Sequence, residues 1–334
     1  MKKVLVLGAT GAMGTYLVPL LLEKGYSVVG VSLDDVTSDH PNLHYIKAFA
    51  TDLDFLKEIL AEGFDGVVDF MIYRTKEQFA ERAALFLPNT SHYIYLSTYR
   101  VYGGSTPIRE DSPRLLDIEK PEDFVSEEEY SIYKAEGEDL LRASGYRNYT
   151  IVRPAITYST CRFQLTILEA NAFLGRLLAG KQVILPEGAM EKEATMSWAG
   201  DVAKMFAAVL FDPRAMGEAY TFSTAEHHTW REVGEMYRRI LGGPEFVTVP
   251  NEDFIALLGG SVYTKQQLLY DRCFDRIVDN SKILTLAGLK QEDLMPLEEG
   301  LRYELSHLTE ERMQKIGTRP DLDAAMDAYL EAHA

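Results

Sequence analysis

A glycine-rich turn near the start of the chain constrains the fold more than any other feature. An apolar run at residues 4–7 leads into the turn, a helical pattern follows at residues 16–23, and a second apolar strand occupies residues 27–32. A strand, a turn, a helix and a strand within about thirty residues form the βαβ unit that holds a dinucleotide pyrophosphate at a helix N-terminus. We therefore predict that the turn GATGAMG binds a dinucleotide. The predicted contact residues are Gly8, Thr10, Gly11, Ala12, Met13 and Gly14.

Each glycine of this turn has its own predicted role. Gly8 permits the tight turn, because glycine adopts positive φ without steric cost. Gly11 lets the backbone approach the pyrophosphate, and Gly14 allows the helix to pack closely against the strand.

The pattern of strand and helix repeats through the N-terminal half. Near-continuous apolar strands are predicted at residues 45–49, 66–72, 92–97 and 149–153, with helices between them. Such alternation is typical of a parallel sheet that is covered on both faces. The predicted fold is therefore α/β, with a Rossmann-type doubly wound parallel sheet.

Beyond residue 158 the alternation becomes irregular, and helices are predicted to predominate, among them one at residues 165–179. We place the dinucleotide-binding domain at residues 1–158 and expect it to receive a strand and a helix from about residues 196–224. Residues 159–334 are predicted to form a smaller, mostly helical substrate-binding lobe.

Tyr130 and Lys134 stand four positions apart in YSIYK, so both side chains project from one face of a helix. A free phenol has a pKa near 10, and a nearby ammonium favours the phenolate and lowers that value. Tyr130 is thus the predicted general acid/base, and Lys134 is the cation that adjusts its pKa. Thr98, at the end of the strand YIYLS, is the predicted hydroxyl that holds a substrate oxygen, with Ser97 as its competitor.

The helix that carries Tyr130 has recognisable predicted ends. Ser126 and Glu129 match an S-x-x-E capping box, acidic residues fill the first turn at 127–129, and Gly145 follows as a C-terminal stop. The sequence therefore predicts a helix that begins directly after Ser126.

The end of the second strand bears on which dinucleotide binds. Asp34 lies about 20 residues past the turn, where a dinucleotide fold places an acid for the ribose hydroxyls, although Ser32 occupies the strand end itself. Residues 25–46 contain no Lys or Arg that would neutralise a 2′-phosphate. The sequence thus favours NAD over NADP without excluding NADP.

Taken in order, these segments resemble the extended short-chain dehydrogenase/reductase family, which includes NAD-dependent nucleotide-sugar epimerases, dehydratases and reductases. The matching segments are GATGAMG, Asp52-Leu53, LSTYRVYG, YSIYK, Arg153-Pro154 and GDVA at residues 200–203. The resemblance implies that Asp52 and Leu53 lie against the adenine, that Lys134 also bonds the nicotinamide ribose, and that Pro154 adjoins the cofactor.

Two segments depart from the family pattern. DFMIY at residues 69–73 replaces the usual strand end beside the nicotinamide, and the acid after the second strand is displaced. The C-terminal half resembles a less characterised branch that includes proteins related to the chloroplast stem-loop-binding group.

The resemblance implies an NAD(P)-dependent oxidoreductase, epimerase or dehydratase that acts on a carbinol or ketone, with a nucleotide-sugar as the small-molecule substrate. The alternative is a non-catalytic protein that uses the same fold to sense a dinucleotide or bind RNA. The Thr–Tyr–Lys set is unnecessary in a sensor. A net charge of −17, from 51 acidic and 34 basic residues, opposes nucleic-acid binding.

Composition also bears on location and partners. The two cysteines are expected to be free thiols in a reducing cytoplasm. No stretch approaches the roughly 20 apolar residues of a membrane helix, so no membrane association is expected. Asp39, His40 and His44 are interpreted as a solvated loop, and no metal site is predicted. A homodimer is left open as the assembly.

Overall fold

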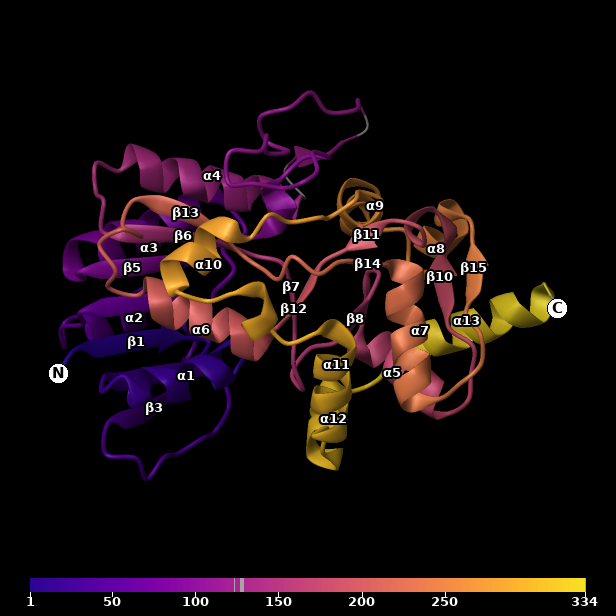
Figure 1. Cartoon of the computed structure of the whole chain (residues 1–334), viewed down its shortest axis with the longest axis horizontal. Coiled ribbons are helices and arrows are strands. Elements are labelled where there is room, and N and C mark those ends of the chain that lie inside the picture. Colours follow the sequence, from indigo (N-terminus) through magenta and orange to yellow (C-terminus); the bar gives the residue numbers. More distant parts are fainter. Residues whose placement is uncertain (123, 127–128, 334) are drawn as a thin grey trace.

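The computed structural model describes residues 1–122, 124–126 and 129–333 (Figure 1). Its main sheet has seven parallel strands in the order β13-β6-β5-β4-β1-β2-β3. The chain reverses its direction of strand addition between β1 and β4, which is the doubly wound arrangement predicted from the sequence. The strands are β1 (Lys3–Leu7), β2 (Ser27–Ser32), β3 (Leu43–Lys47), β4 (Gly66–Asp69), β5 (His92–Leu96), β6 (Tyr149–Pro154) and β13 (Glu218–Phe222).

Helices cover both faces of this sheet, so its central strands are buried on both sides. One face packs against α1 (Gly14–Glu23), α6 (Ala199–Val209) and α10 (Ser281–Ala287). The other face packs against α2 (Leu53–Leu60), α3 (Lys76–Asn89) and α4 (Tyr130–Ala143). The α/β fold class is therefore confirmed.

The C-terminal lobe lies beside the sheet domain (Figure 1). It packs around a second apolar core that includes Trp230 and Tyr237. Its helices are α5 (Ala170–Leu178), α7 (Trp230–Leu241), α8 (Asn251–Leu257), α9 (Val262–Gln267), α11 (Leu297–Ser306), α12 (Glu310–Ile316) and α13 (Pro320–Ala332). Its short strands are β7 (Ile156–Tyr158), β8 (Gln164–Leu165), β9 (Leu168–Glu169), β10 (Ile184–Pro186), β11 (Glu193–Ala194), β12 (Met196–Trp198), β14 (His228–Thr229) and β15 (Val247–Val249).

The structure corrects the helix predicted at residues 165–179. Its first part is a small antiparallel hairpin in which β8 pairs with β9, and α5 begins only at Ala170. Thr166, at the turn of this hairpin, has a φ of 52°, which a continuous right-handed helix excludes. The hairpin places Glu169 beside the cleft described below.

The start of α4 also differs from the prediction. The helix begins at Tyr130, and its N-cap is Glu129, whose carboxylate accepts a hydrogen bond from the Ser131 backbone N–H. Ser126 is therefore not the N-cap of this helix. Glu127 and Glu128, which were predicted to fill its first turn, lie outside the described residues. Tyr130 thus occupies the first helical position, next to the capping carboxylate.

Among the described residues, no helix combines the length and the apolar character that crossing a membrane requires.

The glycines of the turn meet different surroundings. Gly8 has a φ of 88°, as its predicted role in the tight turn requires. A Cβ on Gly14 would lie 2.5 Å from the backbone oxygens of Gly8 and Ala9, whereas a Cβ on Gly11 would meet only the Gly8 oxygen, at 3.3 Å. Gly14 is therefore required for packing of α1 against the turn, whereas Gly11 is exposed and has one close neighbour.

Because backbone atoms have to move to admit a Cβ at position 14, we expect Gly14→Ala to lower the free energy of unfolding by about 1–3 kcal/mol. Gly11→Ala is the matched control and should lower the free energy of unfolding by clearly less. Urea denaturation followed by circular dichroism measures both values. Equal losses in the two variants would contradict this assignment of close packing to Gly14.

Candidate functional site

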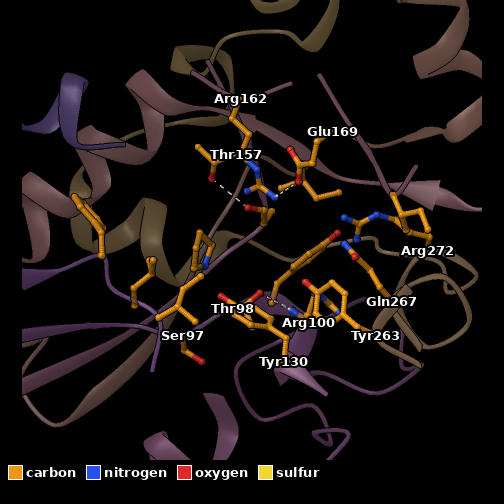
Figure 2. A pocket seen from close by; sticks show the side chains of 18 of the residues that line it. Ser97, Thr98, Arg100, Tyr130, Thr157, Arg162, Glu169, Tyr263, Gln267 and Arg272 are labelled. Atoms are coloured by element: carbon orange, nitrogen blue, oxygen red, sulfur yellow. Dashed lines mark hydrogen bonds and ion pairs between the residues drawn. The ribbon is translucent and has the colours of Figure 1, made fainter. Parts of the chain in front are cut away.

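A cleft of about 890 Å³ lies at the carboxyl edge of the sheet and is lined by residues of both lobes (Figure 2). Ligands of doubly wound sheets bind at this edge, near the point where the strand order reverses. Among the predicted site residues, Met13, Thr98, Tyr130 and Pro154 line the cleft. The fold thus brings together side chains from four separate segments of the sequence.

Of the two competing hydroxyls at the end of β5, Ser97 is already engaged. It is buried, and its Oγ donates a 2.6 Å hydrogen bond to Glu138 of α4. Thr98 is the N-cap of a short 3-10 helix, η1 (Tyr99–Val101), and its Oγ1 accepts a hydrogen bond from the Arg100 backbone N–H at 3.2 Å. Because Oγ1 is only the acceptor in this bond, the Thr98 hydroxyl proton remains available for a ligand. Thr98 is therefore the better candidate to hold a ligand oxygen.

Lys134 lies behind the cleft wall rather than on it. Its Nζ is buried and donates to the Leu96 carbonyl at 2.6 Å and to the Met71 carbonyl at 3.2 Å. Burial lowers the pKa of Lys134 to about 8, although Asp69 and Glu138 oppose the shift. In this arrangement Lys134 ties α4 to the ends of β4 and β5.

The pKa of Tyr130 departs from the sequence-based expectation. Burial raises this pKa to about 12, and the cation that opposes the increase most is Arg100, followed by Arg162. The Lys134 Nζ is 5.8 Å from the centre of the Tyr130 ring, and it is not the group that lowers the phenol's pKa here. The ammonium of Lys134 is directed toward two backbone carbonyls instead, and its role in lowering the Tyr130 pKa stays a prediction.

The turn and the end of β2 form one hydrogen-bonded unit. The Thr10 hydroxyl lies 2.6 Å from the Ser32 hydroxyl and donates to Asp34 at 2.6 Å. The Asp34 backbone N–H donates to the Ser32 hydroxyl at 2.9 Å. The hydrogen bond from Thr10 holds the pKa of Asp34 below its usual value, so its carboxylate is ionised at neutral pH. The displaced acid predicted from the sequence is thus fixed at the strand end by these contacts.

The surroundings of Asp34 also include cations that the local sequence did not reveal. Lys315 of α12 places its Nζ 3.7 Å from Asp34, and both Lys315 and Arg312 lower the pKa of this carboxyl. The absence of Lys and Arg from residues 25–46 therefore does not make this site free of positive charge.

Asp52 and Leu53 lie at the start of α2. Asp52 is its N-cap, and its carboxylate accepts a 2.8 Å hydrogen bond from the Phe55 backbone N–H. This contact gives Asp52 a structural role. The adenine contact implied for Asp52 and Leu53 by the family resemblance stays a prediction.

The cleft lining contains more arginines than carboxylates, unlike the protein as a whole, and four of its five arginines pair with carboxylates. The described residues that line the cleft include a single carboxylate, Glu169, which pairs with Arg162 at 3.4 Å. The lining arginines are Arg74, Arg100, Arg162, Arg272 and Arg319. Sequence reasoning missed all five. Arg100 stands inside the quoted segment LSTYRVYG, but the other four belong to no motif.

The cleft walls also contain apolar side chains, including Phe70, Ile72 and Leu258. Within the described ranges, no group of three or more His, Cys, Asp or Glu residues is placed to hold a metal ion. The arrangement therefore offers hydroxyls, a phenol and guanidinium groups for binding and proton transfer.

Comparison with curated proteins finds one from Arabidopsis thaliana, the chloroplast stem-loop binding protein of 41 kDa b. It is 27% identical over 259 residues, which are 73% of this chain. The match covers 64% of the length of that protein, so the chain corresponds to somewhat less than two thirds of it.

Two solved structures share the fold over nearly the whole chain. UDP-glucose 4-epimerase from Thermotoga maritima, determined with UDP-glucose, has a TM-score of 0.68 and 19% identity, with 91% of this chain and 98% of that chain covered. The dTDP-glucose 4,6-dehydratase from Bacillus anthracis, determined with NAD, has a TM-score of 0.69 and 19% identity, with 95% and 100% covered.

A family model, described as the NAD dependent epimerase/dehydratase family, matches residues 4–223. This match covers more than half of the chain and includes the glycine turn, Thr98, Tyr130 and Lys134. The chain belongs to this family.

Proposed function

We propose that this member of the NAD-dependent epimerase/dehydratase family is an enzyme that acts on a carbinol or ketone of a nucleotide-sugar, with Tyr130 as its general acid/base. The observation that carries the proposal is the shared position of Thr98 and Tyr130 on the wall of one arginine-lined cleft. The glycine turn lies at the same edge of the sheet, directly after β1, and supplies a place for a dinucleotide.

The residues of the sheet edge fit NAD. The open space at Gly11 admits a pyrophosphate close to the backbone, and the start of α1 directs backbone N–H groups toward it. Asp34, ionised and fixed by Thr10, would accept hydrogen bonds from the ribose hydroxyls. When it is bound, the nicotinamide supplies the hydride acceptor and donor.

The chain's own residues would bind the substrate and move its proton. The Thr98 hydroxyl donates a hydrogen bond to the reacting oxygen. Tyr130 takes a proton from that oxygen as the phenolate, or returns one to it as the phenol. The arginines of the cleft neutralise the diphosphate of the substrate, since one guanidinium can donate two parallel hydrogen bonds to a phosphate group. Epimerisation, dehydration and reduction all use these steps, and identification of the product distinguishes them.

The names of two structural relatives support a nucleotide-sugar substrate, because one contains UDP-glucose and the other dTDP-glucose. A second candidate function is RNA binding, because the curated relative is named a stem-loop binding protein. The net charge of −17 weighs against it, since RNA binding depends on Lys and Arg that neutralise phosphates.

The most direct experiment is the identification of ligands released from the purified, denatured protein by mass spectrometry. We expect NAD(H), and a uridine or deoxythymidine diphosphate species if substrate is retained. Turnover of NAD-bound protein with UDP- and dTDP-sugars would follow. A mobility shift with a stem-loop RNA, together with no retained dinucleotide and no turnover, would favour the second candidate.

The turn provides a prediction about the cofactor. Gly11→Val fills the open space beside the backbone, so we expect dinucleotide binding to be lost while the fold is retained. Gly175→Ala is the control, because a Cβ there meets nothing within 4 Å and the residue lies in α5, away from the turn. Titration of NADH fluorescence measures the two dissociation constants. Unchanged affinity in a folded Gly11→Val variant would refute the assignment of this turn.

Cofactor selectivity depends on the charges around Asp34. We expect NAD to bind several-fold more tightly than NADP, because the ionised carboxylate repels a 2′-phosphate. Asp34→Asn should narrow this difference, and Lys315→Gln should widen it by removing the opposing cation. Side-by-side calorimetry with both dinucleotides tests this, and a wild-type preference for NADP would overturn it.

The Tyr130 hydroxyl is the group that the proposed proton transfer requires. Tyr130→Phe removes one oxygen, so it should fold and bind NAD while its turnover number falls by roughly 10²–10⁴-fold, the usual contribution of positioned proton transfer. Tyr133→Phe is the matched control, since its ring packs edge-on against Tyr130 and also lines the cleft. Retention of most activity in Tyr130→Phe would exclude Tyr130 as the acid/base.

The partners of Tyr130 should show different losses in the same assay. Thr98→Val is expected to keep the dinucleotide affinity and lose turnover. Lys134→Met should lose turnover and also weaken dinucleotide binding, because the lysine fixes the strand ends beside the turn.

A further inference from the structure

Arg100 lies immediately beside the phenol that we assign to proton transfer. It follows Thr98 by two residues, in η1, and its side chain is almost fully buried. The centre of its guanidinium is 5.3 Å from the centre of the Tyr130 ring and 5.8 Å from that of Tyr263 (Figure 2). A guanidinium within about 6 Å of an aromatic ring interacts favourably with it.

One carboxylate holds the guanidinium by a hydrogen bond, and a second carboxylate, which also pairs with Arg272 and Arg276, lies close to it. Its Nη2 donates to Glu129 at 2.8 Å, and its Nε lies 3.6 Å from Asp271, in the π-helical segment Leu268–Arg272 of the C-terminal lobe. Glu129 is also bonded by the amide of Gln266, at 3.5 Å. Arg100 therefore has little freedom to leave the ring of Tyr130.

Glu129 couples this ion pair directly to the helix that carries the phenol. The same carboxylate oxygen that accepts from Arg100 also accepts from the Ser131 backbone N–H, as the N-cap of α4. Tyr130 is the residue between the two capping partners. The position of the Arg100 guanidinium and the first turn of α4 are thus fixed by one oxygen atom.

Lys134 is less suited to stabilise the phenolate in this structure. Its ammonium donates to two backbone carbonyls, at 2.6 and 3.2 Å, and burial lowers its pKa to about 8. An arginine, by contrast, keeps its charge at every physiological pH. Arg100 is therefore the fixed cation that favours the Tyr130 phenolate most.

We propose that Arg100 is the positioning residue of Tyr130: it fixes the ring at the start of α4 and stabilises the phenolate when Tyr130 has given up its proton. This role rests on the proposed function of Tyr130 as acid/base. In this proposal Arg100, and not Lys134, is the cation that stabilises the phenolate. Lys134 holds the strand ends.

The charged and titratable groups around Tyr130 support this assignment. Arg100 and Arg162 favour the phenolate, and Tyr263 opposes it, while burial raises the pKa to about 12. Tyr133 and Lys134 face the ring from α4 itself. Arg162 is partly exposed and paired with Glu169, so solvent screens it more than the buried Arg100.

The test measures ionisation at position 130 without any need for substrate. Tyr130 is replaced by 2,3,5-trifluorotyrosine, whose free phenol ionises well below that of tyrosine, and ¹⁹F NMR follows its titration in the full-length, NAD⁺-saturated protein. Arg100→Gln removes the charge and keeps a donor for Glu129. We expect its ionisation to shift upward by about one pH unit or more, as a unit charge about 5 Å away would give at an effective dielectric constant near 20.

Three further variants distinguish a specific electrostatic role from a structural one. Arg100→Lys keeps the charge and should restore most of the shift, and Arg162→Gln should shift the ionisation less than Arg100→Gln. Glu129→Gln should shift it downward, because it removes the anion that partly neutralises Arg100. This last variant is nearly isosteric, so it provides an answer even if Arg100→Gln fails to fold.

The role of Arg100 and the proposed function can fail independently, and different results show which one has failed. No upward shift in Arg100→Gln, or an unchanged or upward shift in Glu129→Gln, would overturn the role of Arg100. Full activity of Tyr130→Phe would instead refute the proposed function, and it would leave the measured ionisation of position 130 as it stands.

Discussion

The site depends on one buried carboxylate, that of Glu138 in α4. It accepts hydrogen bonds from the Arg153 side chain at 2.6 and 2.8 Å and from the Ser97 hydroxyl at 2.6 Å. Burial alone would raise the pKa of Glu138, but Arg153 and the hydrogen bonds hold it below its usual value. Removing one partner of such a buried pair costs about 3–5 kcal/mol. Through these bonds the end of β5, the end of β6 and the helix that carries Tyr130 keep a fixed relation.

This arrangement explains why the inward face of α4 is polar beside an otherwise apolar sheet. Lys134 and Glu138 lie one turn apart and are both buried. Lys134 contacts the ends of β4 and β5, and Glu138 contacts the ends of β5 and β6. A buried charge without partners would be strongly unfavourable, and both side chains instead meet hydrogen-bonding groups at those strand ends. Their first effect is therefore to place Thr98 and Tyr130 on one wall, before any chemistry is considered.

The sequence was sufficient for the parts of the fold that local rules determine. Gly8, Gly11 and Gly14 follow a strand and precede a helix, and the turn forms as expected because its constraints are local. Ser126 was not the helix cap, since the buried Arg100 fixes Glu129 in that role instead. Lys315 approaches Asp34, and Arg272 reaches the cleft, only through packing of distant segments. No local pattern encodes such contacts, so the cations of the site were missed.

The contrast between the whole protein and its cleft has a physical consequence. The protein has a net charge of −17, whereas five arginines and one carboxylate line the cleft. The proposed diphosphate of the substrate would therefore meet a more favourable charge in the cleft than over most of the surface. The same guanidinium groups lie beside a phenol whose burial disfavours ionisation. In the role proposed for Arg100, its hydrogen bond to Glu129 keeps it beside the Tyr130 ring, so a dianion bound by the other guanidinium groups would not draw it away.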